Sequence, residues 1–278
     1  MLTTKQLQDI ETLQKECERH DNLQLKLNWE MLRNRETDQL DFLTYDNEEL
    51  IAFLGVYAFG STAEVCGMVK PSERRQGHFY ELFSKAKVDL KLHGFKNILL
   101  NAPASSEAAK AFLNAEGAIY KFTEHQMYWQ PQLLEASEGF TLRHATSNDI
   151  DMRVRLDIEA FGVSEEDAKV MESRIESDED TDMFMITMDD KTIGKIRVKR
   201  EDGEAWIYGF CILPDYQGKG IGSKVLRKVV KDQSSLGHSV HLEVETKNEH
   251  ALKLYESVGF KAIHAQDYYV YQIKTDSK

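Results

Sequence analysis

Apolar residues recur along this chain with two spacings, and each spacing predicts one kind of element. Alternation rich in β-branched and aromatic residues predicts strands, whereas apolar residues three and four positions apart predict helices. In the second half of the chain, strands are predicted at 140–145, 183–188, 192–200, 205–213, 238–245 and 267–273. Helices are predicted at 147–161, 164–178, 220–237 and 248–258. A meander of strands followed by crossover helices indicates an α/β fold, with a mixed sheet and helices on both faces.

The first half of the chain repeats this order of elements. Its predicted strands lie near 41–45, 50–57, 63–69, 96–101 and 124–129, and its predicted helices near 78–93 and 105–115. Gly77 aligns with Gly220 at an offset of 143 residues, and Gly117 aligns with Gly259 at an offset of 142. A repeat of this length predicts a duplicated domain, the alternative being chance similarity between two strand–turn–helix segments. Because a polar stretch with Pro131 follows the first copy, we expect domains at 1–135 and 139–278.

Composition and charge exclude several classes of protein. Hydrophobic residues make up 41% of the chain and charged residues 29%, which excludes a disordered chain and a disulfide-dense scaffold. The net charge of -12 argues against a nucleic acid partner and weakly favours a cationic small molecule or peptide. The apolar stretch 50–63 is too short to cross a membrane, and the first residues lack the apolar core of an export signal. We therefore expect a cytoplasmic protein without a membrane partner, whose three cysteines are reduced.

A glycine-rich turn stands between a predicted buried strand and a predicted helix. It reads Gln217-Gly218-Lys219-Gly220-Ile221-Gly222, and three basic residues follow it within six positions. The start of a helix attracts a pyrophosphate because its N–H groups are free, and glycines let the backbone approach the ligand. The turn matches neither a Walker A loop nor a dinucleotide fingerprint, since Ser223 stands where the third glycine would be. The alternative is a plain turn before a helix.

After the turn, the chain contains three residues that suit binding or acid–base chemistry. Glu243 lies on a predicted strand, Asn248 opens the next helix and Tyr255 follows two turns later. Each has a structural alternative, because Asn248 is a good N-cap and Tyr255 has core spacing with its apolar neighbours. Singly, these residues fit a structural role as well as a functional one.

Together, these segments resemble the GNAT acyltransferase family. The strings P-D-Y-Q-G-K-G-I-G at 214–222 and L-E-V-E-T-K-N-E-H-A-L-K-L-Y-E-S-V-G-F at 242–260 are similar to its acetyl-CoA-binding and acceptor-side motifs. The spacing of Glu243 and Tyr255, and Asp267-Tyr268-Tyr269 in the last strand, resemble the ribosomal-protein alanine acetyltransferases. The resemblance implies two GNAT folds in tandem and an acetyl-CoA-dependent N-acetyltransferase that acts on a primary amine.

The resemblance also implies roles for particular residues. The turn would hold the CoA pyrophosphate, and the end of the preceding strand would pair with pantetheine through its backbone. The implied binding residues are Phe210, Ile212, Leu213, Gln217, Gly218, Lys219, Gly220, Ile221, Gly222 and Asn248. Glu243 is the first candidate for the base that deprotonates the amine, Glu204 is the second, and Tyr255 would protonate the leaving thiolate. No metal is expected.

The first half lacks the acid and the base. Leu113 aligns with Tyr255 and Phe79 with Gly222, although Gly77 keeps its place in the turn. We therefore expect catalysis, and one tight acetyl-CoA per chain, in the second half. Two other functions stay open, namely a non-catalytic acyl-CoA-binding sensor or scaffold, and a nucleotide-binding module.

An acidic segment bears on the identity of the acceptor. Residues 164–182 include nine acidic and two basic side chains. In the GNAT family the segment after the first helix borders the acceptor cleft, so a cationic amine is expected to be steered there. The alternative is a solvated helix face.

Overall fold

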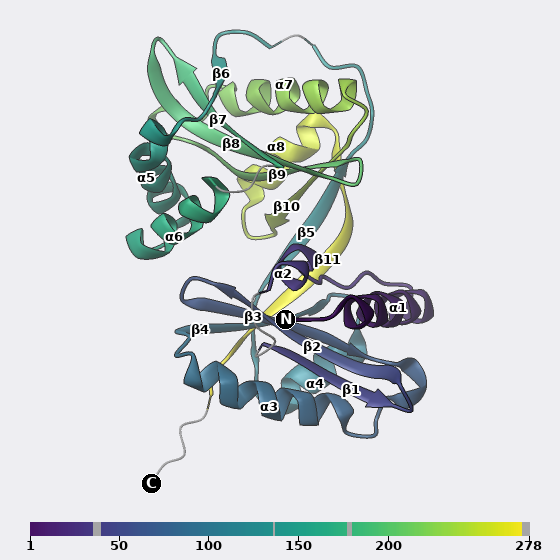
Figure 1. Cartoon of the computed structure of the whole chain (residues 1–278). Helices are drawn as coiled ribbons and strands as arrows, with labels where there is room; N and C mark the ends of the chain where they lie inside the picture. Colours follow the sequence, from purple (N-terminus) through teal and green to yellow (C-terminus); the bar gives the residue numbers. More distant parts are fainter. Residues whose placement is uncertain (36–39, 136, 177–179, 274–278) are drawn as a thin grey trace. The chain divides into compact units, whose positions relative to one another are not determined.

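The computed structural model describes residues 1–35, 40–135, 137–176 and 180–273, and Figure 1 shows the order of the elements. These residues form two compact units. Unit 1 comprises Met1–Thr123 with His264–Lys278, and unit 2 comprises Glu124–Ile263. No helix in the described ranges is long and apolar enough to span a membrane.

Unit 1 is a mixed sheet with helices on both faces. Its strands lie in the order β1-β2-β3-β4-β11. Helices α1 and α2 cover an apolar cluster on one face, and α3 and α4 cover a second cluster on the other face. The elements are β1 (Asp41–Asp46), β2 (Glu49–Phe59), β3 (Thr62–Val69), β4 (Asn97–Pro103), α1 (Thr4–Asp21), α2 (Trp29–Arg33), η1 (Pro71–Glu73), α3 (His78–Leu92) and α4 (Glu107–Ala115).

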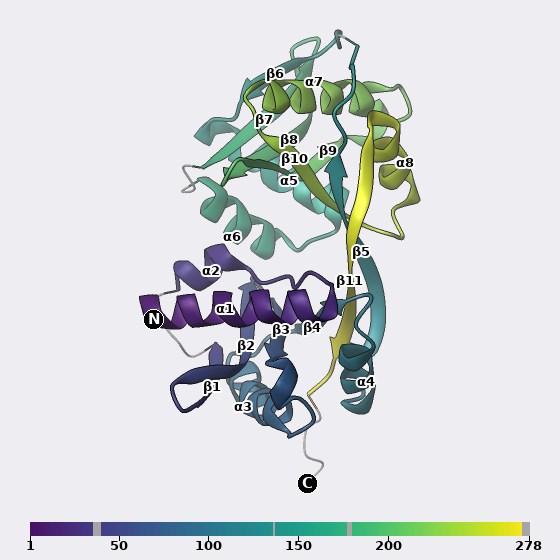
Figure 2. The ribbon, with the colours of Figure 1, turned by 90° about the vertical axis from the view of Figure 1, so that its right-hand side faces the viewer.

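Unit 2 repeats this architecture, with strands in the order β5-β10-β9-β8-β7-β6. Helices α7 and α8 pack on one face of its sheet, and α5 and α6 lie on the other (Figures 1 and 2). The elements are β6 (Thr141–His144), η2 (Ser147–Asp149), α5 (Ile150–Phe161), α6 (Glu165–Glu176), β7 (Thr181–Met188), β8 (Lys191–Glu201), β9 (Glu204–Ile212), η3 (Pro214–Tyr216), α7 (Ile221–Ser235), β10 (Ser239–Glu245) and α8 (Glu249–Val258). The predicted α/β class, with mixed sheets flanked by helices, is confirmed.

Two long strands, β5 (Ile119–Trp129) and β11 (Phe260–Tyr271), each begin in one unit and end in the other. The second half of β5 pairs antiparallel with β10 of unit 2, from Glu124–Glu245 to Tyr128–His241. The second half of β11 pairs antiparallel with β4 of unit 1, from Gln266–Pro103 to Tyr271–Ile98. The last strand of each sequence repeat therefore completes the sheet of the other unit. The units consequently differ from the expected ranges of 1–135 and 139–278.

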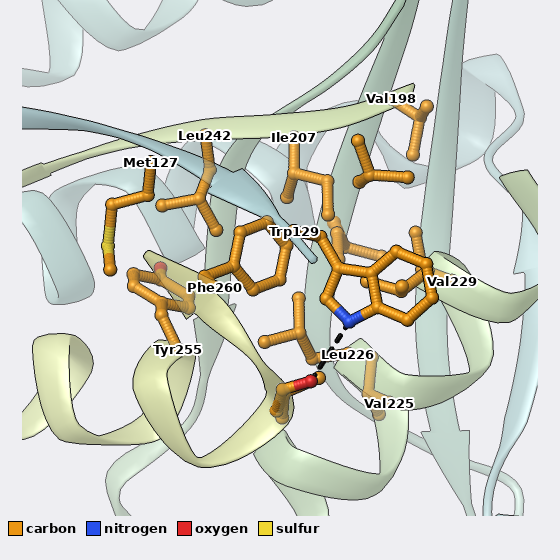
Figure 3. Packing of buried hydrophobic residues seen from close by; sticks show 14 of the residues in the cluster. Met127, Trp129, Val198, Ile207, Val225, Leu226, Val229, Leu242, Tyr255 and Phe260 are labelled. Atoms are coloured by element: carbon orange, nitrogen blue, oxygen red, sulfur yellow. Dashed lines mark hydrogen bonds between the residues drawn. The ribbon is translucent and has the colours of Figure 1, made fainter. Parts of the chain in front are cut away.

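The core of unit 2 shows why β5 belongs there. Met127 and Trp129 of β5 are buried beside Leu242 of β10 and the residues of α7 and α8 (Figure 3). The Trp129 indole Nε1–H donates a hydrogen bond of 3.0 Å to the Val258 carbonyl at the end of α8. A buried indole needs such a partner, so this bond fixes the end of β5 against α8.

The sequence pattern located nearly all the elements, and the differences lie at particular ends. β5 and β11 begin at 119 and 260 rather than at the predicted 124 and 267. The early parts of both strands are largely exposed, so they carry little of the apolar alternation from which strands are predicted. Helices α1 and α2 were not among the predicted elements.

Candidate functional site

β9 and β10 in unit 2 run side by side for four residues and then separate. Their parallel pairing begins at Glu204–Ser239 and ends at Ile207–Leu242. β9 continues to Ile212, so its edge from 209 to 212 has no partner on β10 among the described residues. An unpaired strand edge offers backbone N–H and C=O groups to a ligand.

A β-bulge lies in this unpaired part of β9. Gly209 and Phe210 both stand opposite Ile196, because the pairing with β8 passes from Tyr208–Arg197 to Cys211–Lys195. Gly209 has φ 54°, a left-handed conformation that costs other residues about 1–2 kcal/mol. Bulges of this kind redirect the strand and its side chains. We did not anticipate Gly209, although a glycine inside an apolar strand is a recognised signal of a bulge.

The glycine turn after β9 is held in a fixed conformation. Gly218 and Gly220 have φ of 71° and 75°, and a Cβ on either would meet no other atom within 4 Å. Glycine is therefore required here by backbone conformation rather than by space. The Gln217 side-chain amide donates a 2.7 Å hydrogen bond to the Ile212 carbonyl, which ties the turn to the end of β9.

The first turn of α7 faces the separated strand. A Cβ built on Gly222 would lie 3.4 Å from Leu254 of α8 and 3.7 Å from the ring of Phe210. A larger side chain would therefore fill the space between α7, α8 and the bulge. Lys219, by contrast, extends over the Tyr216 ring, and its Nζ donates a 2.8 Å hydrogen bond to the Asp215 carbonyl.

The other implied binding residues have mainly structural contacts. The Leu213 N–H donates to the Ile193 carbonyl at 2.8 Å, so it is already used within the sheet. Ile221 is buried in the core as the first residue of α7. Asn248 is the N-cap of α8, and its side chain accepts the Ala251 N–H at 3.1 Å. The N-cap alternative for Asn248 is thus what these contacts describe.

Tyr255 of α8 lies in the core that adjoins the separated strands. Its side chain is 9% exposed and contacts Phe260, with the two rings 6.1 Å apart (Figure 3). Burial raises the pKa of Tyr255 to about 12, and the nearby Cys211 thiol contributes to the increase. The phenol is therefore protonated at neutral pH and can act as a hydrogen-bond or proton donor.

Glu243 and Glu204 occupy different places relative to the opening. Glu243 is the first residue of β10 after the paired segment, directly at the point of separation. Glu204 is the first residue of β9, five positions before the bulge, or about 16 Å along an extended strand. Its Oε2 accepts the indole N–H of Trp206 at 2.8 Å. The geometry therefore favours Glu243 over Glu204.

The motif predicted in the last strand does not belong to unit 2. Asp267, Tyr268 and Tyr269, which resemble a motif of the alanine acetyltransferases, all belong to unit 1. There, the Lys26 ammonium donates a 2.8 Å hydrogen bond to the Tyr268 hydroxyl, and Asp267 accepts one of 2.6 Å from Thr123.

A cluster of four buried charges lies between α5, α6 and β8 of unit 2. The Lys195 ammonium is 2.6 Å from Asp157 and 2.5 Å from Glu172, and Arg153 also pairs with Glu172. None of the four residues is more than 5% exposed, and Lys195 stands opposite Cys211 in the sheet. The matching position of unit 1, under α1 and α2, is apolar. The sequence did not predict this cluster because its residues lie far apart in the chain. The only local signal was Lys195, a charged residue within an apolar strand.

The pKa values of the two carboxyl groups in this cluster are shifted in opposite directions. Burial is the main cause that raises the pKa of Asp157 to about 6, and the hydrogen bond with Glu172 adds to the increase. Burial alone would raise the pKa of Glu172, but its bond with Asp157 and the charge of Lys195 lower it overall. The cluster is therefore neutral above pH 6 and gains a positive charge as Asp157 takes up a proton.

Lys195→Met is expected to destabilise the chain by about 3–5 kcal/mol at pH 8, because two buried carboxylates lose their main counter-ion. The loss should be smaller at pH 5 than at pH 8, because at pH 5 Asp157, with its pKa of about 6, is already mostly neutral in the native chain and is neutral in the variant too. Chemical denaturation at pH 5 and pH 8 measures both values. The control is Lys169→Met, which breaks the exposed pair with Glu165 and should leave the stability nearly unchanged at either pH. Equal losses for the two variants would contradict this account.

The acidic segment proves to be partly internal. Glu172 belongs to the buried cluster, and Asp182 lies 2.6 Å from Arg200. Glu165 pairs with Lys169 on the surface of α6. Residues 177–179 of the segment lie outside the described residues. Of the described residues, no group of three or more His, Cys, Asp and Glu side chains is arranged to hold a metal ion.

Comparison with known proteins finds similarity to acetyltransferases over the part of the chain that contains this site. The family model described as "Acetyltransferase (GNAT) domain" matches residues 142–274. A mycothiol acetyltransferase of Propionibacterium freudenreichii subsp. shermanii is 25% identical over 274 residues, which cover 91% of this chain and 85% of that protein. The [ribosomal protein bS18]-alanine N-acetyltransferase of Escherichia coli K12 is 35% identical over 68 residues, or 24% of this chain and 46% of that protein.

A solved structure extends the similarity to both units. The GCN5-related N-acetyltransferase from Sphaerobacter thermophilus superposes with a TM-score of 0.79 at 21% identity, covering 96% of this chain and 92% of that one. The fold of the whole chain is therefore that of a two-unit GNAT protein, as the repeat predicted. The second half of the chain, over residues 142–274, is thus a GNAT acetyltransferase domain, and the chain as a whole is similar to GNAT acetyltransferases in sequence and in fold.

Proposed function

We propose that unit 2 transfers an acetyl group from acetyl-CoA to a primary amine by direct attack. The observation that carries the proposal is the separation of β9 from β10 after Ile207–Leu242. The glycine turn and the start of α7 lie at one end of the opened strand, and Glu243 stands at the point where the opening begins. No other described part of unit 2 combines a strand edge, an anion cradle and an acid–base pair.

The residues of unit 2 fit the parts of acetyl-CoA. The turn at 217–222, with the free N–H groups of the start of α7, suits the pyrophosphate. The edge of β9 at Phe210 and Ile212 that β10 does not pair suits the amide groups of pantetheine, although the Ile212 carbonyl already accepts the Gln217 amide. Backbone N–H groups at the bulge would stabilise the negative charge that develops on the thioester oxygen.

The chemistry then needs two proton transfers. The amine nitrogen attacks the thioester carbon, the C–S bond breaks, and the amine proton passes to Glu243 directly or through water. Tyr255 donates a proton to the leaving sulfur. Glu243 lies on the face of β10 opposite to Leu242 and Val244, which pack with Tyr255, so base and acid approach the opening from its two sides. This arrangement keeps the amine and the leaving thiol apart.

A direct assay separates this proposal from a sensor or scaffold that binds acyl-CoA without turnover. Acetyl-CoA is mixed with a panel of polyamines, aminoglycosides and peptides, and release of the free thiol is followed. An enzyme should release CoA in the presence of at least one amine and yield its acetylated product. Stoichiometric binding without release across the panel, and across N-terminal peptides, would favour the sensor.

Gly222→Leu is expected to weaken acetyl-CoA binding at least tenfold, because the new side chain would fill the space bounded by Leu254 and Phe210. Calorimetry with acetyl-CoA measures the change. The matched control is Ser223→Leu, one position further into α7, which should leave the affinity within about twofold. Unchanged binding by Gly222→Leu would remove the start of α7 from the proposed site.

For the acceptor we propose a cationic amine, steered by the acidic surface of α6. The supporting charges are Glu165, Glu166 and Asp167 in its first turn, because Glu172 is buried in the ion cluster. Since exposed charges are screened by salt, the association rate of a polyamine acceptor should fall roughly threefold or more between low and physiological ionic strength. Stopped-flow measurements with the native chain and with Glu165→Gln/Glu166→Gln test this. An association rate independent of salt would exclude steering.

A further inference from the structure

A cavity of about 630 Å³ lies within unit 1. It opens where β3 and β4 separate, because their parallel pairing ends at Val65–Leu100 while β3 continues to Val69. Residues of α4 and the end of α1 form its other walls. The volume is within the range of about 300–1,000 Å³ that small-molecule sites occupy.

The loop beside this cavity has kept the shape of its counterpart in unit 2. Arg75 and Gly77 have φ of 66° and 94°, where Gly218 and Gly220 have 71° and 75°. The Arg74 Nε–H donates to the Val69 carbonyl at 3.1 Å, just as Gln217 donates to Ile212. Arg75 therefore holds a left-handed conformation that is costly for a residue with a side chain. Unit 1 has preserved the geometry of a ligand site.

The charge of the loop has not been preserved. Residues 216–228 include four basic side chains and no acidic one, a net charge of +4. The aligned residues 73–85 include three basic and two acidic side chains, a net charge of +1. Even that remainder is cancelled, because both terminal nitrogens of Arg74 bind the Asp21 carboxylate, at 2.9 and 2.7 Å. Glu81 stands in the first turn of α3 where Lys224 stands in α7. A pyrophosphate has little electrostatic attraction to this loop.

The walls of the cavity are predominantly apolar. Phe79, which replaces the glycine of unit 2, lies edge-on to Phe112 at 4.9 Å and against the backbone of Gly67. Its ring is partly buried against the apolar cluster under α3 and α4. Phe83, Leu100 and Leu113 line the same space. Burial of an aliphatic or aromatic ligand here gains about 25 cal/mol for each Å² removed from water.

We propose that unit 1 binds an uncharged, largely apolar small molecule in this cavity, instead of a nucleotide pyrophosphate. The loop has the same backbone form as the unit 2 cradle. The lost positive charge and the three phenylalanines show how its ligand differs. The cavity is thus a second binding site on the chain, separate from the proposed acetyl-CoA site.

The test uses N-phenyl-1-naphthylamine, a neutral probe whose fluorescence rises in an apolar site. The intact native chain should bind one probe, and 1-decanol should displace it. Ala109 lines the cavity from α4. Ala109→Trp should lower the affinity for the probe at least tenfold, while acetyl-CoA affinity and the rate of amine acetylation stay within twofold of the native values. The matched variant is Ala251→Trp, at the aligned position of α8. It should leave the affinity for the probe unchanged and lower the affinity for acetyl-CoA.

The outcomes separate this proposal from the proposed function. Probe binding that does not saturate, or that is unchanged in Ala109→Trp, would overturn the proposal of an apolar site. A second acetyl-CoA per chain that is lost on Ala109→Trp also overturns it, since unit 1 would then be a CoA site. If Ala109→Trp does not fold, Ala109→Leu must still weaken the probe by at least threefold. Failure of acetyl-CoA to bind unit 2, with the probe bound as expected, would refute only the catalytic assignment.

Discussion

Tyr255→Phe is expected to lower turnover roughly a hundredfold or more while acetyl-CoA affinity stays within about twofold. The variant removes only the hydroxyl, and the ring keeps its place against Phe260. The loss arises because the departing thiolate no longer receives a proton in the transition state. Steady-state kinetics with any accepted amine gives the turnover, and calorimetry gives the affinity.

The pH dependence of the native enzyme adds a second measurement. Because burial raises the pKa of Tyr255 to about 12, the phenol stays protonated over the working range. The activity should therefore not fall on the alkaline side below about pH 10, and any acid limb should come from the base and the amine.

The control for Tyr255→Phe is Tyr120→Phe. Tyr120 is exposed in unit 1, and its hydroxyl bonds only to Thr123 among the contacts described. It should leave turnover unchanged. Full activity of Tyr255→Phe would assign the proton to another group and would leave Tyr255 as a packing residue of the core.

Removal of residues 1–135 is expected to abolish folding of the second half of the chain. The truncation deletes β5, which supplies a strand next to β10 and buries Met127 and Trp129 in the core of unit 2. Loss of one such large side chain costs about 2–5 kcal/mol, and a domain has only about 5–15 kcal/mol in all. Circular dichroism and thermal denaturation of the truncated chain measure the outcome.

A chain of residues 124–263 is the matched comparison. It keeps β5 beside β10 and omits the segment of β11 that pairs with β4. It should unfold cooperatively, whereas a chain of residues 136–278 should show no cooperative unfolding transition. A truncated chain 136–278 that is as stable as 124–263 would show that β5 contributes nothing to unit 2.

The sequence predicted those parts of the molecule that depend on local residues. Gly218 and Gly220 need positive φ whatever surrounds them, so the turn and the start of α7 could be located from the chain alone. The α/β class followed from the order of apolar patterns. The aligned glycines revealed the duplication because both copies keep the same turn geometry.

The remaining features depend on which distant residues meet. Lys195 meets Asp157 and Glu172 only after α5 and α6 have packed on β8. Likewise, the alternation in β5 and β11 predicts two strands but does not say which strands they will pair with. The acidic segment was expected to border the acceptor cleft, with a solvated helix face as the alternative, yet Glu172 is buried there with two counter-ions.

The course of β11 has a consequence for the time order of folding. Unit 1 holds nearly all of its residues in the first 123 positions, but Asn101 of its sheet pairs with Tyr268. During synthesis, the edge of β4 must therefore wait for the last residues of the chain, and closing so long a loop slows folding. An N-terminal unit that emerges first is thus completed last. Refolding of the intact chain should show no phase in which unit 1 alone reaches native protection from hydrogen exchange.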